Sequence, residues 1–250
     1  MLKSFSKLST AYRVLKESGC SGLYATFMYR YFWPIGSRVS RNAAKHWEEI
    51  RYWQRQARQG ALDNSWYVGL FTKPFGLDIV DFDGKRILDI GCGPLGSLEW
   101  ANSARERVGL DPLVSQYTDL GISKHAMKYV KGRSEEIPFE DQHFDYVTCF
   151  NALDHVDDVH KSLDEIVRVL RIGGRFLIMV DIGHNPTLSE PHRLQWDVLD
   201  RISDRCTTLR CQRFEQVGGA AKSVQEGREF TSLDSARNEG VLLAMLERKC

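Results

Sequence analysis

Short apolar segments separated by longer polar or amphipathic stretches fill the chain from Lys85 onward. Apolar runs that alternate with helix-length segments predict the strands of a parallel sheet whose faces are covered by helices. The strands that the pattern predicts lie at 86–90, 107–110, 128–130, 144–150 and 175–180, with later ones near 208–217 and 241–246. The fold class that follows is α/β.

Two helices are predicted from the spacing of their apolar side chains. Leu163, Ile166, Val167 and Leu170 recur at intervals of three and four residues, which predicts a helix over 158–170. The same kind of spacing predicts a helix over 41–59, whereas 218–238 shows no clear period and its structure is left open. We interpret residues 1–75 as a helical N-terminal extension and residues 76–250 as the main domain.

The composition is that of a folded globular chain. Of its 250 residues, 42% are apolar and 27% are charged, with 34 basic side chains against 33 acidic ones. The longest apolar window, 22–36, is interrupted by Arg30 and is shorter than the roughly 20 residues of a spanning helix. The N-terminus lacks the continuous apolar stretch of a secretory signal. We therefore expect a cytoplasmic protein.

The charges and the cysteines narrow the range of partners. The first sixty residues hold eleven basic and three acidic side chains, so this basic and aromatic segment carries a net charge of +8. One expectation is a peripheral contact with an anionic membrane through residues 1–40; packing on the acidic remainder is the alternative, and no nucleic acid is expected. The six cysteines form no C-x-x-C pair and have no accompanying histidine spacing, so we expect reduced thiols and no metal site.

A glycine-rich turn follows the first predicted strand. Residues 86–96 read RILDIGCGPLG and place Gly91, Gly93 and Gly96 in a G-x-G-x-x-G pattern ahead of an expected helix. Glycines let backbone approach a ligand closely, and the start of a helix presents free N–H groups. The same pattern could serve a dinucleotide, with Asp111 at the end of the next strand binding a ribose.

Asp89 distinguishes between the possible ligands of this turn. Its carboxylate lies two residues before Gly91, where it would repel a pyrophosphate and attract an ammonium or sulfonium group. S-adenosylmethionine (SAM) combines such a cation with a ribose diol and an adenine. The turn therefore favours SAM over a nicotinamide dinucleotide.

Four motifs in order resemble those of class I SAM-dependent methyltransferases of the small-molecule type, the UbiE-like or type 11 group. They are LDIGCGPLG at 88–96, VGLDP at 108–112, EEIPFEDQHFDYVTCFNALDHVDD at 135–158 and LDEIVRVLRIGGRFLI at 163–178. The resemblance implies a Rossmann-like seven-stranded sheet, mostly parallel with an antiparallel last strand. It also implies a cofactor over the carboxyl ends of the first strands, which makes residues 76–250 the SAM-binding catalytic domain.

The resemblance implies roles for individual residues at the cofactor site. Those that would bind SAM are Asp89, Gly91, Cys92, Gly93, Asp111, Pro112 and Asn151. The family commonly places an acid where this chain has Arg133, so Ser134 and Glu135 are the available substitutes near the adenine.

Methyl transfer needs alignment of the acceptor, exclusion of water and in some cases a base. His155 is the favoured base because the loop after the fourth strand lies beside the cofactor in the family, and an ordinary imidazole pKa suits proton removal. The other candidate bases are His184 and His192, and the candidate acceptor-binding residues are Trp66, Tyr67 and Glu190. A solvated loop and core packing are the alternatives for these residues.

The function predicted is SAM-dependent methylation of a small-molecule or lipid-linked acceptor, with oxygen favoured over nitrogen or carbon. Two alternatives stay open. The first is an NAD-dependent oxidoreductase, and the second is a non-catalytic module that binds SAM or another protein.

Overall fold

The computed structural model describes residues 38–60, 63–230 and 239–250, and their side chains from residue 43 onward. By compactness the chain divides between Arg51 and Tyr52. The predicted helix over 41–59 is confirmed as α2, Arg38–Arg58. The expected membrane contact of residues 1–40 falls almost wholly outside the described residues.

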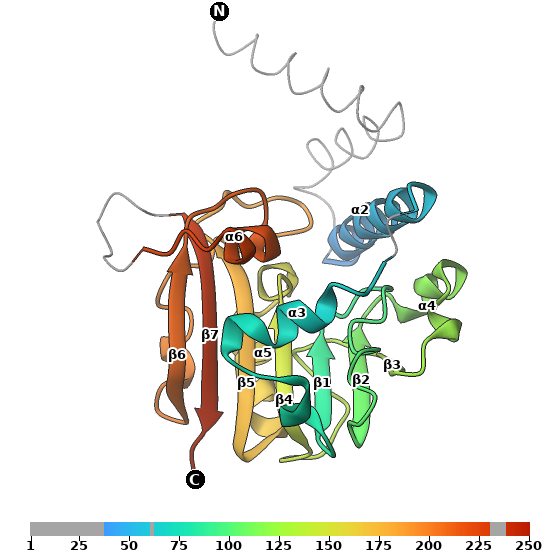
Figure 1. The fold of residues 1–250 in the computed structure, drawn as a ribbon. Coiled ribbons are helices and arrows are strands. Elements are labelled where there is room, and N and C mark those ends of the chain that lie inside the picture. Colours follow the sequence, from blue (N-terminus) through green and yellow to red (C-terminus); the bar gives the residue numbers. More distant parts are fainter. Residues whose placement is uncertain (1–37, 61–62, 231–238) are drawn as a thin grey trace, which may run out of the picture. The chain divides into compact units, whose positions relative to one another are not determined.

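Seven strands form one sheet in the order β3-β2-β1-β4-β5-β7-β6 (Figure 1). Their bounds are β1 Arg86–Ile90, β2 Glu106–Asp111, β3 Lys128–Lys131, β4 Phe144–Phe150, β5 Leu170–Ile182, β6 Cys206–Phe214 and β7 Gly240–Arg248. All seven predicted strands are confirmed, and β5 extends beyond its predicted range at both ends. The first five strands pair in parallel, whereas β7 is antiparallel to both β5 and β6. The Rossmann-like fold expected from the motifs is therefore correct.

Successive side chains of each strand point to opposite sides of the sheet, and a core cluster buries each side. Leu88 contributes to the core cluster that contains the apolar face of α5, Val159–Val169, the helix predicted over 158–170. Ile87, the preceding residue, contributes to the other cluster, with α3, Tyr67–Phe71, and α6, Ala220–Glu226. Figure 1 shows α5 behind the sheet and the other two helices in front.

Residues 67–75 belong to the core of the second compact unit. Leu70, Phe71 and Phe75 are buried there together with residues of the sheet. The short helix α6 lies within 218–238, the segment for which the sequence indicates no structure. Among the described residues no helix has the length and apolar character that crossing a membrane would require.

The helix expected directly after the glycine turn is absent, and that prediction was wrong. Residues 91–105 form a series of turns between β1 and β2, and the next helix is α4, Val114–Tyr117, after β2. Gly91, Gly93 and Gly96 all have left-handed φ angles, at +69°, +58° and +76°. A right-handed helix cannot pass through such residues, so the turn offers no helix N-terminus to an anion.

Gly91 provides a stability test of this turn. A Cβ at Gly91 would lie 2.4 Å from the Cβ of Ala152, and its φ is left-handed. We expect Gly91→Ala to lower the free energy of unfolding by about 2–4 kcal/mol, because strain and overpacking add. Urea unfolding measures the change.

Gly173→Ala is the matched control, since Gly173 has a φ of +71° but a Cβ at this position would meet nothing within 4 Å. It should cost only the backbone strain, about 1–2 kcal/mol. Equal losses in the two variants would show that the contact with Ala152 has no energetic weight.

Candidate active site

The glycine turn lies at the carboxyl end of β1, between the ends of β2 and β4. The N–H of Gly91 donates to the carbonyl of Leu110 at 2.9 Å, which joins the turn to β2. A Cβ at Gly93 would lie 2.9 Å from the ring of Trp53. Glycine backbone and the ring of Trp53 therefore meet at the place where parallel sheets of this kind bind ligands.

Asp89 is a buried carboxylate at the base of this turn, only 4% exposed. Its two oxygens accept hydrogen bonds from Ser97 Oγ at 2.5 Å and from Thr148 Oγ1 at 2.6 Å. Burial raises the pKa of Asp89 to about 6, although the two hydroxyl donors lower it and oppose that effect. At neutral pH the site thus holds a negative charge that a cationic ligand would stabilise.

Both carboxylate oxygens of Asp111, at the end of β2, accept hydrogen bonds from backbone N–H groups. Oδ2 accepts from the N–H of Gly93 at 3.2 Å, and Oδ1 accepts from the N–H of Leu113 at 2.8 Å. Pro112 between them is half-buried. The structure therefore brings Asp89, Gly93, Asp111 and Pro112 together around one turn.

Cys92 packs inside the turn. A Cβ at Gly109 would lie 2.5 Å from its sulfur, so the thiol fills the space over β2. Burial raises the pKa of Cys92 well above its ordinary value, which keeps the thiol neutral. These features give Cys92 a packing role.

Tyr67 and Trp66 stack on each other at the start of α3, with ring centroids 4.1 Å apart. Burial raises the pKa of the Tyr67 phenol, and the charge of Asp89 raises it further. That electrostatic influence requires the phenol to lie near the glycine turn. Trp66 is exposed, at 39%.

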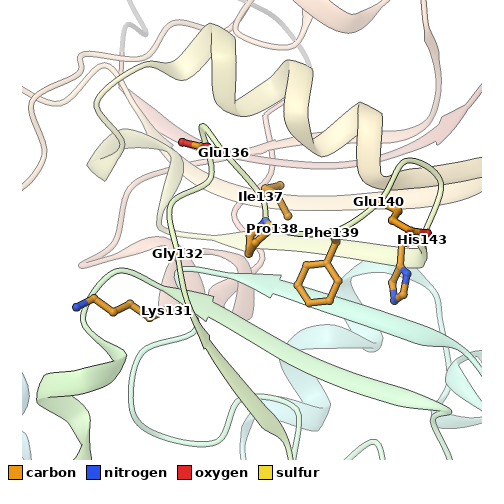
Figure 2. Close-up of a pocket in the computed structure, with 8 residues that line it drawn as sticks. All are labelled: Lys131, Gly132, Glu136, Ile137, Pro138, Phe139, Glu140 and His143. Carbon is orange, nitrogen blue, oxygen red and sulfur yellow. The ribbon is translucent and has the colours of Figure 1, made fainter.

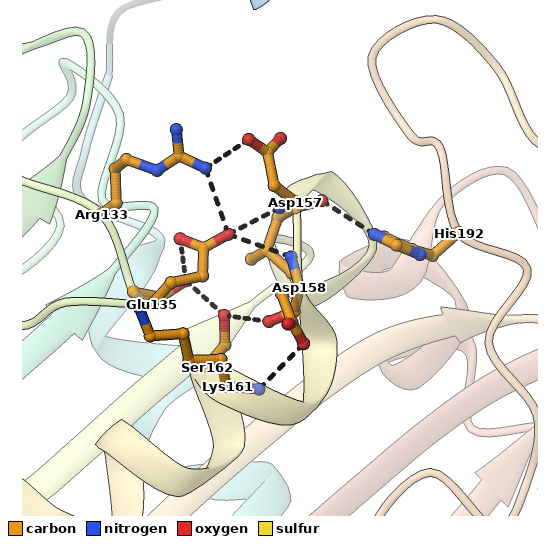
Figure 3. Close-up of polar contacts among 9 residues, drawn as sticks. Arg133, Glu135, Asp157, Asp158, Lys161, Ser162 and His192 are labelled. Carbon is orange, nitrogen blue, oxygen red and sulfur yellow. Dashed lines mark hydrogen bonds and ion pairs between the residues drawn. The ribbon is translucent and has the colours of Figure 1, made fainter. Parts of the chain in front are cut away.

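Ser134 and Glu135 both make hydrogen bonds within the protein, and Figure 3 shows those of Glu135. Ser134 shares a hydrogen bond of 2.8 Å with Ser162. Glu135 accepts from the backbone N–H of Asp157 at 2.6 Å and of Asp158 at 3.2 Å. Burial alone would raise the pKa of Glu135, but these donors outweigh it and the pKa is lowered.

Arg133, which stands where the family has an acid, pairs with Asp157 and Glu135 (Figure 3). Its positive charge therefore serves to hold the loop after β4. This arrangement explains how the chain accommodates an arginine at that position.

Asn151 and His192 lie near the ends of β4 and β5. Asn151 has a left-handed φ of +51°, and its N–H donates to the carbonyl of Met179 at 2.7 Å, while its side chain is exposed. His192 Nε2 lies 2.9 Å from the carbonyl oxygen of Val156 and donates to it (Figure 3). That bond attaches the loop after β5 to the loop after β4.

His155, His184 and Glu190 gather around the buried Asp154. His184 Nε2 lies 3.2 Å from Asp154 Oδ2, and His155 Nε2 lies 3.8 Å from Glu190 Oε1. The adjacent Asp154 carboxylate raises the pKa of His184 to about 9 although burial opposes this. His184 is therefore a cation at neutral pH and a poor proton acceptor in this state.

A separate shallow pocket lies along the segment that connects β3 with β4 (Figure 2). Its lining includes Lys131, Pro138, Phe139 and His143, with the last two rings 5.2 Å apart. None of the predicted cofactor residues lines this pocket.

Sequence reasoning missed Ser97, Thr148 and Asp154. Thr148 offered a signal, because it is the one serine or threonine within the apolar strand β4. The sequence position of Asp154 is typical of an acid at a helix start, yet the side chain is 1% exposed in the structure.

Comparisons with known proteins agree with this geometry. Residues 88–178 match a family described as a methyltransferase domain. A phthiotriol/phenolphthiotriol dimycocerosates methyltransferase from Mycobacterium ulcerans is 26% identical over 73% of this chain and 69% of its own length. A ubiquinone/menaquinone biosynthesis C-methyltransferase, UbiE, from Pseudomonas savastanoi is 34% identical, but the match covers only 38% of this chain and 41% of the relative.

The fold has solved counterparts as well. The crystal structure of YcgJ from Bacillus subtilis covers 73% of this chain and 97% of its own, with a TM-score of 0.52 at 19% identity. The family match and these relatives identify residues 88–178 as a SAM-dependent methyltransferase domain, whose cofactor is SAM. The buried carboxylate of Asp89 and the glycine backbone of the turn fit that cofactor, because they suit a cationic group and a close backbone approach.

The pKa of Asp89 leads to a prediction for SAM affinity. The carboxylate attracts the cofactor only when ionised, and its pKa of about 6 lies above the ordinary value of 3.8, so acidification removes this attraction. Affinity should be constant above about pH 7 and fall roughly tenfold by about pH 5, where nine-tenths of the carboxyl is protonated.

Calorimetric titration with SAM across this range tests the effect. Asp89→Asn carries no titrating charge, so its affinity should be lower at neutral pH and independent of pH. An unchanged slope in that variant would assign the titration to another group.

Proposed function

We propose that the chain transfers the methyl group of SAM to a hydroxyl oxygen of a small-molecule or lipid-linked acceptor. The observation that carries this proposal is the buried Asp89 beneath a glycine turn that lacks a helix. A dinucleotide pyrophosphate would meet a negative charge there without the compensating helix N-terminus. A sulfonium or ammonium group would instead be attracted.

The remaining parts of the cofactor have candidate partners around the same turn. We propose that Gly91 and Gly93 contact the methionine part through their backbone, with Asn151 at its far side. Asp111 would accept the ribose hydroxyls, since each of its oxygens can accept more than one hydrogen bond. Pro112 would lie against the adenine.

Ser134 and Glu135 are weaker candidates for the adenine. Both already bond within the protein, and Glu135 serves two backbone N–H groups. Their contribution would come through the shape of the loop that they hold.

The acceptor class is suggested by the relatives. The Mycobacterium ulcerans relative is named for phthiotriol and phenolphthiotriol dimycocerosates, and a triol offers hydroxyl groups. The UbiE relative is named as a C-methyltransferase, so carbon is the second candidate. A large acceptor would need binding surface beyond the turn, and we propose that Trp66 and Tyr67 supply part of it.

Residues 1–75 would act as an extension that covers the site or docks the acceptor. The support concerns the last part of this range, because Tyr67, in the second compact unit, lies close enough to Asp89 for the carboxylate to affect its pKa. An aromatic face also favours a nearby sulfonium cation.

His155 is the proposed base that removes the proton of the acceptor hydroxyl. It is half-buried after β4, whereas His184 is positively charged beside Asp154 and cannot take a further proton. His192 is held by its bond to the Val156 carbonyl and would support the loop.

Calorimetry with SAM and with NADH tests the cofactor. We expect saturable binding of SAM and no binding of NADH, because Asp89 favours a cation over a pyrophosphate. Tight binding of NADH would reject the proposal. Release of S-adenosylhomocysteine with a hydroxylated lipid or small molecule would separate an enzyme from a module that only binds SAM.

His155→Ala tests the base. Loss of a positioned base should lower kcat by about 10²- to 10⁴-fold while the affinity for SAM stays within about twofold. His160→Ala, an exposed histidine on α5, is the control and should keep both values. Unchanged turnover in His155→Ala would remove His155 from the catalytic residues.

A further inference from the structure

Three side chains with metal-binding groups meet beyond the carboxyl ends of β4 and β5. Asp154 belongs to the short turn after β4, whereas His184 and Glu190 belong to the loop after β5. One ligand atom of each lies within 4.8 Å of the others, and the His184–Asp154 pair is 3.2 Å apart. Ligands at bond lengths of about 2.0–2.2 Å from one ion stand roughly 3–4.4 Å apart, so a small closure would bring all three onto one ion.

Asp154 lacks the hydrogen-bond donors that a buried carboxylate normally has. The carboxylate is 1% exposed, and among the described residues no hydrogen-bond donor serves either of its oxygens. Its nearest donor is His184 Nε2 at 3.2 Å, an ion pair that falls short of hydrogen-bond geometry, and a metal ion would displace the proton of this nitrogen. Burying such groups without partners is costly, and a metal ion would bond the same atoms that lack one.

The outer contacts orient these side chains for metal binding. His184 Nδ1 lies 3.2 Å from the carbonyl oxygen of Asn185 and donates to it, which directs Nε2 to Asp154. Thr187 Oγ1 lies 3.3 Å from Glu190 Oε2 and donates to it. Hydrogen bonds of this kind to the far atoms of ligands are typical of metal sites in proteins.

The charges around the cluster favour a cation. Asp181 at the end of β5 is a third carboxylate close to Asp154 and Glu190. It lies close enough to Asp154, His184 and Glu190 to interact with their charges. Three carboxylates against two imidazoles, those of His155 and His184, leave an excess of negative charge.

We propose that Asp154, His184 and Glu190 bind a divalent first-row transition-metal ion. One imidazole and two carboxylates form a mixed nitrogen and oxygen donor set, which suits such ions better than thiol-seeking ones. This revises the expectation of no metal site. His155 lies beside the cluster, 4.0 Å from Asp154 Oδ1. If the proposed methyl transfer holds, an acceptor oxygen on the ion would lose its proton more easily.

Metal titration of the untagged full chain tests the site. After treatment with a chelator, the protein is titrated with Mn²⁺ by calorimetry and with Co²⁺ by absorption spectroscopy. We expect one ion per chain and Co²⁺ bands of nitrogen and oxygen ligation without thiolate charge transfer. His184→Gln and Glu190→Gln should each weaken binding at least about tenfold, whereas the exposed His160→Gln should bind as the unchanged chain does.

Two results would overturn the inference. They are the lack of saturable binding in the unchanged chain and equal binding in the chain and both ligand variants. Circular dichroism checks that the variants fold. As a second measurement, Mn²⁺ should raise the melting temperature of the unchanged chain but of neither ligand variant, because an ion that binds only the folded state stabilises it.

SAM calorimetry on the metal-free chain separates this inference from the proposed function. SAM binding together with absent metal binding overturns only the metal site. Metal binding together with absent SAM binding supports the metal site and counts against the proposed cofactor.

Discussion

Asp111 connects the backbone of two turns, and the cofactor site depends on that connection. Its carboxylate accepts from the N–H of Gly93 after β1 and from the N–H of Leu113 after β2. No helix follows Gly93, so the N–H groups of this turn are not held by helix contacts and a buried carboxylate satisfies one of them. The burial of Asp111 makes the bond stronger than the same contact would be in water. The left-handed glycines of the turn can then keep their open conformation.

Negative charge is therefore concentrated at this edge of the sheet. Asp89 and Asp111 line the turn after β1, Asp181 lies at the end of β5, and Asp154 and Glu190 lie in the loops after β4 and β5. The first group is neutralised in part by hydroxyl and backbone donors, whereas Asp154 lacks such donors among the described residues. The difference in hydrogen-bond donors makes the first group suitable for an organic cation and the group around Asp154 suitable for a metal ion. Both sites lie along the carboxyl ends of adjacent strands.

The positions of the strands could be predicted closely from the sequence, but the structure of the segments that connect them could not. Strands 86–90 and 144–150 were predicted with their observed bounds, because strands buried on both faces appear as continuous apolar runs. The prediction of a helix after the glycine turn was wrong, because the apolar pattern does not reveal φ angles. The left-handed φ of Gly96 ends any helix at that point. The partners of Glu135 lie more than twenty residues further on, so no local spacing could indicate them. Asp154 and His184 come from different loops, and for the same reason no spacing in the sequence indicates a metal site.

The position of β7 has a consequence for how the chain assembles during synthesis. This strand is the last in sequence among those described, yet it lies between β5 and β6 and is the sheet neighbour of both. Until 240–248 leave the ribosome, β6 has no strand to pair with and one side of β5 remains an unpaired edge. Exposed edges of this kind invite pairing with other chains. The nascent protein therefore passes through a stage in which chaperone binding would protect it from aggregation.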